Sequence, residues 1–274
     1  MSSPNGSLSQ YYDRLSRYGA LARLIGRDGG YGRATVHRLL RSTDAATDPA
    51  DVIHSRIAAL SSRPPGRLLD AGCGLGGTSF YFAQRFETVC DGVTLSPAQA
   101  DAASQAAAAR GLADRCRFRV ASYDAPTEAR YDLIVAIESL AHSADPAASL
   151  ANLAKARAPG GRVVVVDDVR SVDADPADVA AFVAGWQAPG FRTRADWVLA
   201  FEAAGLRLDA EHDLTPLVPQ RGALAREALL LANRAAALLP FAAWRGVLAS
   251  HRGGLALERL YAAGGATYRL LAGV

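Results

Sequence analysis

A glycine-rich turn directly follows a short apolar stretch near residue 70. Residues 67–70 read Arg-Leu-Leu-Asp and are predicted to form a strand, and residues 70–77 read Asp-Ala-Gly-Cys-Gly-Leu-Gly-Gly. Glycine allows positive φ and lets a ligand approach the backbone, because it has no Cβ. Ligands of open parallel sheets bind beyond the carboxyl ends of the strands. The strand before the turn, the helical pattern after it and the acid at the strand end favour a ligand-binding loop over a plain tight turn.

The segments around this loop alternate between strand and helix patterns. Ser96-Pro97 and Asp145-Pro146 are strong helix starts, because Ser and Asp are good N-caps and Pro fits the first helical position. The alternation predicts an α/β fold with a mainly parallel sheet, right-handed crossovers and helices on both faces. The predicted strands are residues 67–70, 87–94, 116–120, 131–137 and 162–167, and the predicted helices are residues 78–85, 97–110 and 146–157.

Helical patterns dominate outside this core. The expected division is an N-terminal helical segment covering the site at 1–60, a core at 61–215 with an inserted cap segment near 170–195, and a C-terminal helical region at 216–274. Residues 207–212 are predicted to form a late strand, and the chain is predicted to be helical from Gly222 to its end. We expect both helical segments to cover the site at the sheet.

Composition excludes several classes of protein. The net charge is +3 with charges of both signs interspersed, so no nucleic-acid-binding stripe is expected. The chain has no uninterrupted apolar run of about 18 residues, so no membrane span is predicted. Cys73, Cys90 and Cys116 share no metal-ligand spacing, so no metal is predicted, and their odd number without a secretory signal favours a reducing, cytoplasmic location. The oligomeric state stays open, with a homodimer as the candidate.

Four segments in the expected order resemble one known family. Residues 68–78 resemble motif I of class I S-adenosylmethionine-dependent methyltransferases, and residues 92–99 resemble the Gly-Val-Thr-Leu-Ser-Pro segment of the tocopherol and cyclopropane-lipid branch. Residues 131–135 and 136–142 are similar to the fourth strand and the segment after it in small-molecule O- and C-methyltransferases. The resemblance covers roughly residues 62–168. It implies a Rossmann-like fold with S-adenosyl-L-methionine as cofactor.

The family's cofactor contacts carry over to particular positions. The resemblance implies that the glycines pass close to the amino acid part of the cofactor while Asp70 orients it. Many relatives hold the ribose with an acid where this chain has Thr94, so ribose contacts are expected from side chains or backbone around it. Ser122 and Asp124 both remain candidates for the adenine amino group. The candidate cofactor-binding residues are Asp70, Gly72, Cys73, Gly74, Gly76, Thr94, Leu95, Ser96, Gln99, Ser122, Tyr123, Asp124, Tyr11 and Tyr12.

Two residues after the fourth predicted strand could serve catalysis. His142 is the better candidate for a base, because the unperturbed pKa of histidine lies near neutrality. A capping or packing role for His142 is the alternative. Glu138 could bind a substrate hydroxyl, act as a base or stabilise a carbocation, and it could equally be a buried acid bonded to nearby backbone.

The function predicted from these features is methylation of a small natural-product-type acceptor, at oxygen, nitrogen or carbon. An apolar or aromatic acceptor is favoured by aromatic residues in and near the C-terminal part. These are Trp186, Phe191, Trp197, Phe201, Phe241, Trp244, Tyr261 and Tyr268. Two alternatives stay open. One is a cofactor-binding enzyme of the same fold that catalyses a cyclisation or an elimination, and the other is a non-catalytic partner protein.

Overall fold

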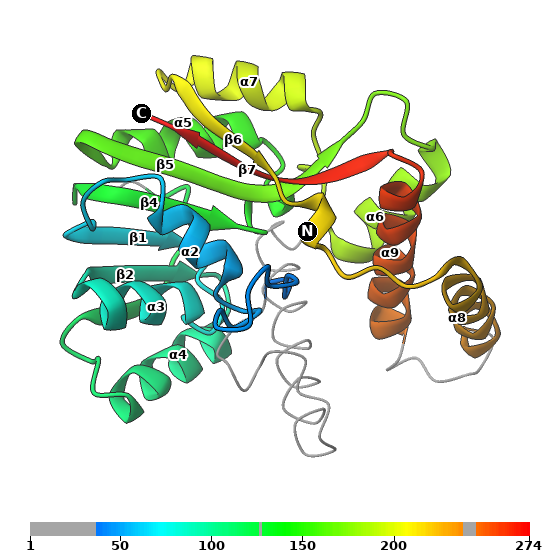
Figure 1. The fold of residues 1–274 in the computed structure, drawn as a ribbon, viewed down its shortest axis with the longest axis horizontal. Coiled ribbons are helices and arrows are strands. Elements are labelled where there is room, and N and C mark those ends of the chain that lie inside the picture. The colour runs from blue at the N-terminus through cyan, green and yellow to red at the C-terminus, as the bar shows by residue number, and fades with distance from the viewer. Residues whose placement is uncertain (1–36, 126–127, 238–244) are drawn as a thin grey trace, which may run out of the picture.

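A seven-stranded sheet with the order β3-β2-β1-β4-β5-β7-β6 runs through the computed structural model, which describes residues 37–125, 128–237 and 245–274 (Figure 1). Strands β1 to β5 pair in parallel, and β7 runs antiparallel to its neighbours β5 and β6. The strands are β1 Arg67–Ala71, β2 Val89–Thr94, β3 Cys116–Val120, β4 Tyr131–Ile137, β5 Arg157–Arg170, β6 Leu208–Asp213 and β7 Ala266–Gly273. The predicted mainly parallel Rossmann-like sheet is thus confirmed.

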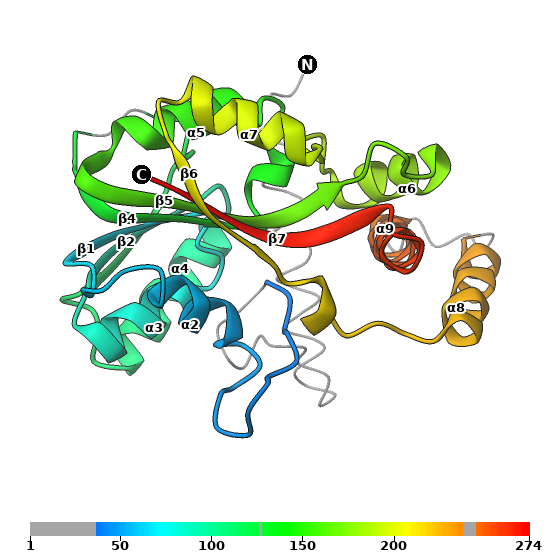
Figure 2. The ribbon, with the colours of Figure 1, turned by 45° about the horizontal axis from the view of Figure 1, so that its top comes forward.

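Helices cover both faces of the sheet. Helices α5 and α7 lie on one face and α2, α3 and α4 on the other (Figure 2), while α6 and α9 lie beyond the ends of β5 and β7. The helices are α2 Val52–Ala58, α3 Gly77–Phe86, α4 Pro97–Ala109, α5 Pro146–Lys155, α6 Pro176–Trp186, α7 Arg194–Ala203, α8 Ala223–Ala236 and α9 Arg245–Ala262, with short 3-10 turns η2 Leu140–His142 and η3 Thr215–Leu217. Within the described ranges, no helix is long and apolar enough to cross a membrane.

The strands are apolar on both faces, because side chains alternate between two cores. Leu68 packs in the core under α2, α3, α6 and α9, and its neighbour Leu69 packs in the core under α5 and α7. Val164 and Val165 divide between the same two cores. A parallel sheet buried on both faces reads as a continuous hydrophobic run, which explains the sequence of β5.

Local capping fixes where the helices begin. The Ser96 hydroxyl accepts the Gln99 backbone N–H at the start of α4, and the Asp145 carboxylate accepts the Ala148 N–H at the start of α5. A proline occupies the first turn in both helices. The two helix starts predicted from these residue pairs are confirmed.

The C-terminal end corrects the prediction of helix from Gly222 to the end of the chain. Residues 223–236 and 245–262 are helical, but residues 266–273 form β7 in the middle of the sheet. Gly264 has φ of +73° just after α9, so a glycine turn separates the helix from the strand. Thr267 and Arg269 alternate with buried residues at the start of β7, but the following Leu270, Leu271 and Ala272 are consecutive buried residues, so the alternation is too short to identify a strand.

Asp70 at the end of β1 is buried and accepts the Ser79 hydroxyl of α3 at 2.9 Å. Burial raises the pKa of Asp70 from 3.8 to about 6, and the hydrogen bonds from Ser79 oppose that rise. The folded protein therefore favours the protonated carboxyl more than the unfolded chain does.

We expect Leu270→Ala to lower the free energy of unfolding by about 2–5 kcal/mol, because it opens a cavity at a fully buried position of β7. Leu224→Ala on α8 is the control, since Leu224 is 90% exposed and its loss should change stability little. Urea unfolding of both variants measures the effect. Equal stability of the two variants would contradict the placement of β7 inside the sheet.

We expect Asp70→Asn to remove part of the pH dependence of stability. A raised acid pKa means that stability is fully present below the unfolded pKa and is lost as the pH rises through the folded pKa. Relative to Asp70→Asn, the wild-type free energy of unfolding should fall by on the order of 3 kcal/mol between about pH 4 and about pH 7. Urea titrations across this range give the difference, and a difference independent of pH would refute the assignment.

Candidate functional site

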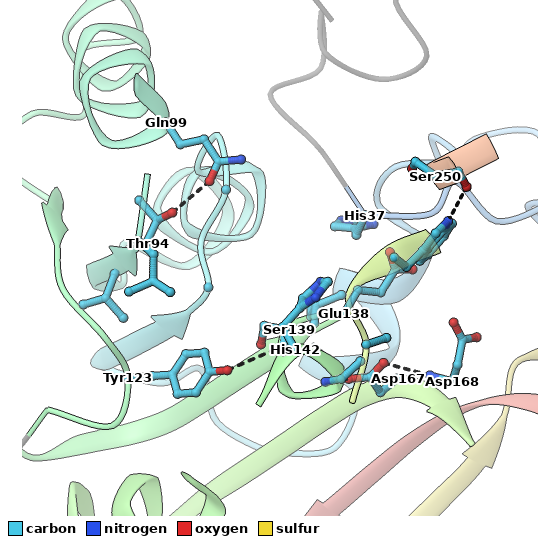
Figure 3. A pocket seen from close by; sticks show the side chains of 18 of the residues that line it. His37, Thr94, Gln99, Tyr123, Glu138, Ser139, His142, Asp167, Asp168 and Ser250 are labelled. Carbon is cyan, nitrogen blue, oxygen red and sulfur yellow. Dashed lines mark hydrogen bonds between the residues drawn. The ribbon is translucent and has the colours of Figure 1, made fainter. Parts of the chain in front are cut away.

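A cavity of about 240 Å³ lies beyond the carboxyl ends of the central strands. The glycine loop after β1, the ends of β2 and β4, and residues of α6 and α9 line it. Figure 3 shows the labelled side chains in two groups. Thr94, Gln99 and Tyr123 lie on one side of the cavity, and Glu138, Asp168, His37 and Ser250 lie on the other. Ser139 and His142 lie between the two groups. The cavity therefore has a glycine-loop end and an end near β5 and α9.

The glycine loop reaches the cavity at two of its predicted positions. Gly72 and Gly74 line the cavity and have φ of +92° and +52°. A Cβ added to Gly72 would lie 2.5 Å from the Cβ of Ser139, so a side chain there would collide with the loop after β4. The backbone of β1 and the loop after β4 are also joined by the Ser139 hydroxyl, which donates to the Ala71 carbonyl at 2.7 Å.

Three other predicted loop residues are not among the described lining of this cavity. Asp70 faces Ser79, and Cys73 is buried. Gly76 is the N-cap of α3 with φ of +88°, where a Cβ would lie 2.7 Å from the Phe118 ring. These positions shape the loop through helix packing and capping.

The segment after β2 supplies the next predicted group. Thr94, Leu95 and Gln99 line the cavity, and the Thr94 hydroxyl donates to Gln99 Oε1 at 2.8 Å. Ser96 is fully buried and caps α4. The structure thus brings Thr94 and Gln99 together as a polar pair and gives Ser96 the N-cap role.

The segment after β3 places one of its three candidates in the cavity. Tyr123 lines it, and its hydroxyl donates to the Ser139 carbonyl at 3.2 Å. Burial raises the pKa of Tyr123, so the phenol stays protonated near neutral pH. Ser122 donates to Asp124, which also accepts the Ser149 hydroxyl of α5 at 2.6 Å. Ser122 and Asp124 are not among the described lining residues, and Tyr11 and Tyr12 fall outside the described residues.

His142 lies in η2 and lines the cavity. Its Nδ1 is 3.0 Å from the carbonyl oxygen of Gln187, so Nδ1 carries the hydrogen and donates it. In a neutral ring this hydrogen bond leaves the basic lone pair on Nε2. Burial lowers the pKa of His142, which keeps the ring neutral near physiological pH.

Glu138 also lines the cavity, directly after β4, with a φ of +49° that is unusual for a residue with a side chain. Its Oε1 accepts the hydroxyl of Tyr268 at 2.8 Å and the backbone N–H of Arg38 at 3.1 Å. Burial raises the pKa of Glu138, and the nearby Arg38 guanidinium opposes that rise. Strained backbone of this kind is commonly found at functional sites.

Sequence reasoning missed a charged cluster beside Glu138. Arg38 donates to both oxygens of Asp168 at 2.9 and 3.1 Å, and its guanidinium lies 4.6 Å from the centre of the Tyr268 ring. The Tyr261 hydroxyl of α9 donates to Asp168 as well. Asp168 and its neighbour Asp167 follow the same rule as the predicted residues, because they lie toward the carboxyl end of a strand. Arg38 has no comparable signal in the sequence.

Asp167 links the strand to the loop that holds His142. Its two oxygens accept the backbone N–H groups of Ala141 and Asp168, each at 2.9 Å. Burial and the adjacent Asp168 raise the pKa of Asp167 well above its usual value. In the described part of the chain, no group of three or more His, Cys, Asp or Glu residues has the arrangement of a metal site.

Known protein sequences match the central region of the chain. The family model described as a methyltransferase domain matches residues 69–163. The chloroplastic tocopherol O-methyltransferase of Arabidopsis thaliana is 43% identical over 102 residues, which are 36% of this chain and 29% of that protein. Norajmaline N-methyltransferase of Rauvolfia serpentina is 29% identical over 173 residues, which are 61% of this chain and 59% of that protein. The chain thus matches less than two thirds of the length of either relative.

Solved structures extend the likeness over nearly the whole chain. A geranyl diphosphate methyltransferase in complex with GPP and sinefungin aligns with a TM-score of 0.71 and 22% identity over 99% of both chains. The cyclase SpnF aligns with a TM-score of 0.69 and 19% identity over 94% of this chain and 93% of its own. At identities this low, the structural alignments establish the fold alone. Residues 69–163 therefore match a methyltransferase domain, and the chain has the fold of small-molecule methyltransferases, as the sequence resemblance predicted.

Proposed function

We propose that the protein is an S-adenosylmethionine-dependent methyltransferase that acts on a small, apolar or aromatic acceptor. The observation that carries this proposal is the cavity lining: Gly72 and Gly74 meet Thr94, Gln99 and Tyr123 there, at the ends of β1, β2 and β3. The match of residues 69–163 to a methyltransferase domain supports the same reading.

The residues of the glycine-loop end fit the cofactor. Gly72 and Gly74 expose backbone to the cavity, and the Thr94–Gln99 pair offers hydroxyl and amide groups for hydrogen bonds with ribose hydroxyls. Tyr123 offers an aromatic ring for the adenine. When bound, S-adenosylmethionine supplies an electrophilic methyl group.

The chain's own residues would then bind and orient the acceptor. His142 Nε2 is the proton acceptor when the nucleophile carries a proton, because Nδ1 is held as a donor by the Gln187 carbonyl. Glu138 would hold a polar group of the acceptor, and its position in the cavity lining supports this role. Apolar contacts and water exclusion come from Phe182 and Trp186 of α6, which line the same cavity. The predicted roles of His142 and Glu138 remain part of this proposal.

The alternative reactions differ in the fate of the cofactor. A cyclisation or elimination on the same fold would leave the methyl group on the cofactor, and a non-catalytic partner protein would turn over nothing. Mass analysis of acceptor and cofactor after incubation separates these cases from methyl transfer. For the compartment, we propose the cytoplasm, because Cys73, Cys90 and Cys116 are all unpaired and buried thiols. A homodimer that binds no nucleic acid remains the proposed assembly.

Calorimetric titration of the protein with S-adenosylmethionine and S-adenosylhomocysteine tests the cofactor site. We expect micromolar binding, equivalent to about −8 kcal/mol. Gly74→Arg should abolish it, because the new side chain would extend from a residue that lines the cavity. Gly222→Arg is the control, since nothing lies within 4 Å of a Cβ there. Unchanged affinity in Gly74→Arg would disprove the assignment of the glycine loop.

We expect His142→Ala to lower methyl transfer by about 10²–10⁴-fold for an acceptor that must lose a proton. Binding of S-adenosylhomocysteine should change little. His212→Ala is the matched control, because His212 is exposed on β6 and is not a lining residue of the cavity. Steady-state kinetics give the comparison, and full activity of His142→Ala would return His142 to a structural role.

A further inference from the structure

The described lining of the cavity has more acidic side chains than lysines and arginines. Glu138, Asp167 and Asp168 all line it, whereas its described lining contains no lysine or arginine. Glu138 directly follows β4, Asp167 and Asp168 belong to β5, and Figure 3 shows Glu138 and Asp168 on the opposite side from Thr94 and Gln99. The acid groups therefore gather at the end away from the glycine-loop pair.

Arg38 carries a single positive charge, and its closest acid is Asp168. Its guanidinium donates to both oxygens of Asp168, and it lies over the ring of Tyr268. A paired guanidinium of this kind satisfies the charge of one carboxylate. Glu138 receives the Arg38 backbone N–H, and its carboxylate oxygen lies 4.0 Å from Arg38 Nε. The two carboxylate oxygens of Asp167 accept the backbone N–H groups of Ala141 and Asp168.

The histidines that line the cavity add no positive charge near neutral pH. Burial and the neighbouring His54 lower the pKa of His37 to about 3. Burial also lowers the pKa of His142. An acceptor with an acidic head group would therefore meet carboxyl groups and neutral rings at this end of the cavity.

The rest of this end is apolar and aromatic. Phe182, Trp186 and Ala188 line it, and the Trp186 indole N–H is held by the Ser250 carbonyl of α9 at 2.9 Å. Aromatic faces also attract cations, as the placement of Arg38 over Tyr268 illustrates. The lining combines a hydrophobic wall with an excess of carboxyl groups.

We propose that this end of the cavity selects an apolar acceptor that carries a basic nitrogen and rejects acceptors with a carboxylate or phosphate head group. The proposal names the substrate class of the methyltransferase proposed above and rests on that function. Its basis is the charge of the described part of the cavity lining, where Glu138 and Asp167 remain beyond the Arg38–Asp168 pair.

Binding of a cation should release protons from the site. Burial raises the pKa of both Glu138 and Asp167 and so favours their protonated forms. A bound ammonium group favours their ionised forms and lowers those pKa values. Among the described residues, the titratable and charged groups around these two acids are Arg38, His37, Tyr123, His142, Asp168, Tyr261 and Tyr268.

Titration of one matched series tests the head-group preference. The probes are 4-phenylbutylamine, 4-phenylbutan-1-ol and 4-phenylbutyrate, which share a hydrocarbon and differ in charge. For protein saturated with S-adenosylhomocysteine, we expect the amine to bind roughly tenfold or more tightly than the acid, with the alcohol between them. Calorimetry of the amine in phosphate and in Tris buffer should show net proton release, because the two buffers differ in ionisation enthalpy.

Glu138→Gln should reduce the preference for the amine several-fold, because it removes a charge while keeping an oxygen for Tyr268 and Arg38. Glu202→Gln, at an exposed position of α7, should leave the preference unchanged. Equal or tighter binding of 4-phenylbutyrate, or no proton release with the amine, would overturn the proposal, and so would binding of none of the probes.

The experiment separates this inference from the proposed function. Failure of S-adenosylhomocysteine to bind would count against the methyltransferase assignment. The same probe series would then be titrated into the protein alone, where the charge of the lining predicts the same order of affinities. Should Glu138→Gln not fold, the wild-type affinity order and proton release still decide the question.

Discussion

The contact between Gly72 and Ser139 is the constraint on which the rest of the site depends. These residues follow the neighbouring strands β1 and β4, and their backbones come so close that a Cβ on Gly72 would lie 2.5 Å from the Cβ of Ser139. Ser139 also donates to Ala71 and accepts from Tyr123 through its carbonyl. This contact joins the glycine loop to the segment that carries Glu138 and His142, so the glycine-loop end and the end near β5 and α9 share one cavity.

A second set of interactions holds the opposite end of the cavity. Asp168 is buried and Arg38 is partly buried, and burying an ion pair is favourable only when its geometry is good and further hydrogen bonds satisfy the groups. Here the pair has two parallel hydrogen bonds, and Tyr261 donates to the same carboxylate. Because Tyr261 belongs to α9 and Tyr268 to β7, the C-terminal elements are tied to the end of β5. The charge of this cluster underlies the proposed preference for a basic head group.

The polar groups near the cavity divide into those that face it and those that build its walls. Thr94 and Gln99 face it as a pair, whereas Ser96 between them is used by the start of α4. Asp124 is used in the same way, because it accepts Ser149 of α5. One short segment thus supplies both a helix cap and a pair that faces the cavity, since consecutive side chains at a strand end point in different directions.

The sequence by itself determined the parallel sheet, the helix starts and the glycine loop, because each depends on residues close together in the chain. Gly72 and Gly74, Thr94 and Gln99, and Glu138 and His142 were all found from strand-end motifs, and all line the cavity. Only the tertiary structure decided that Asp70 faces Ser79, that Ser122 and Asp124 bond to each other, and that β7 enters the sheet. It alone also brought Arg38 to Asp168, 130 positions away, and to Tyr261, 223 positions away. No local pattern encodes such contacts, because they depend on how β5, β7 and α9, which are far apart in the chain, are arranged in the folded protein.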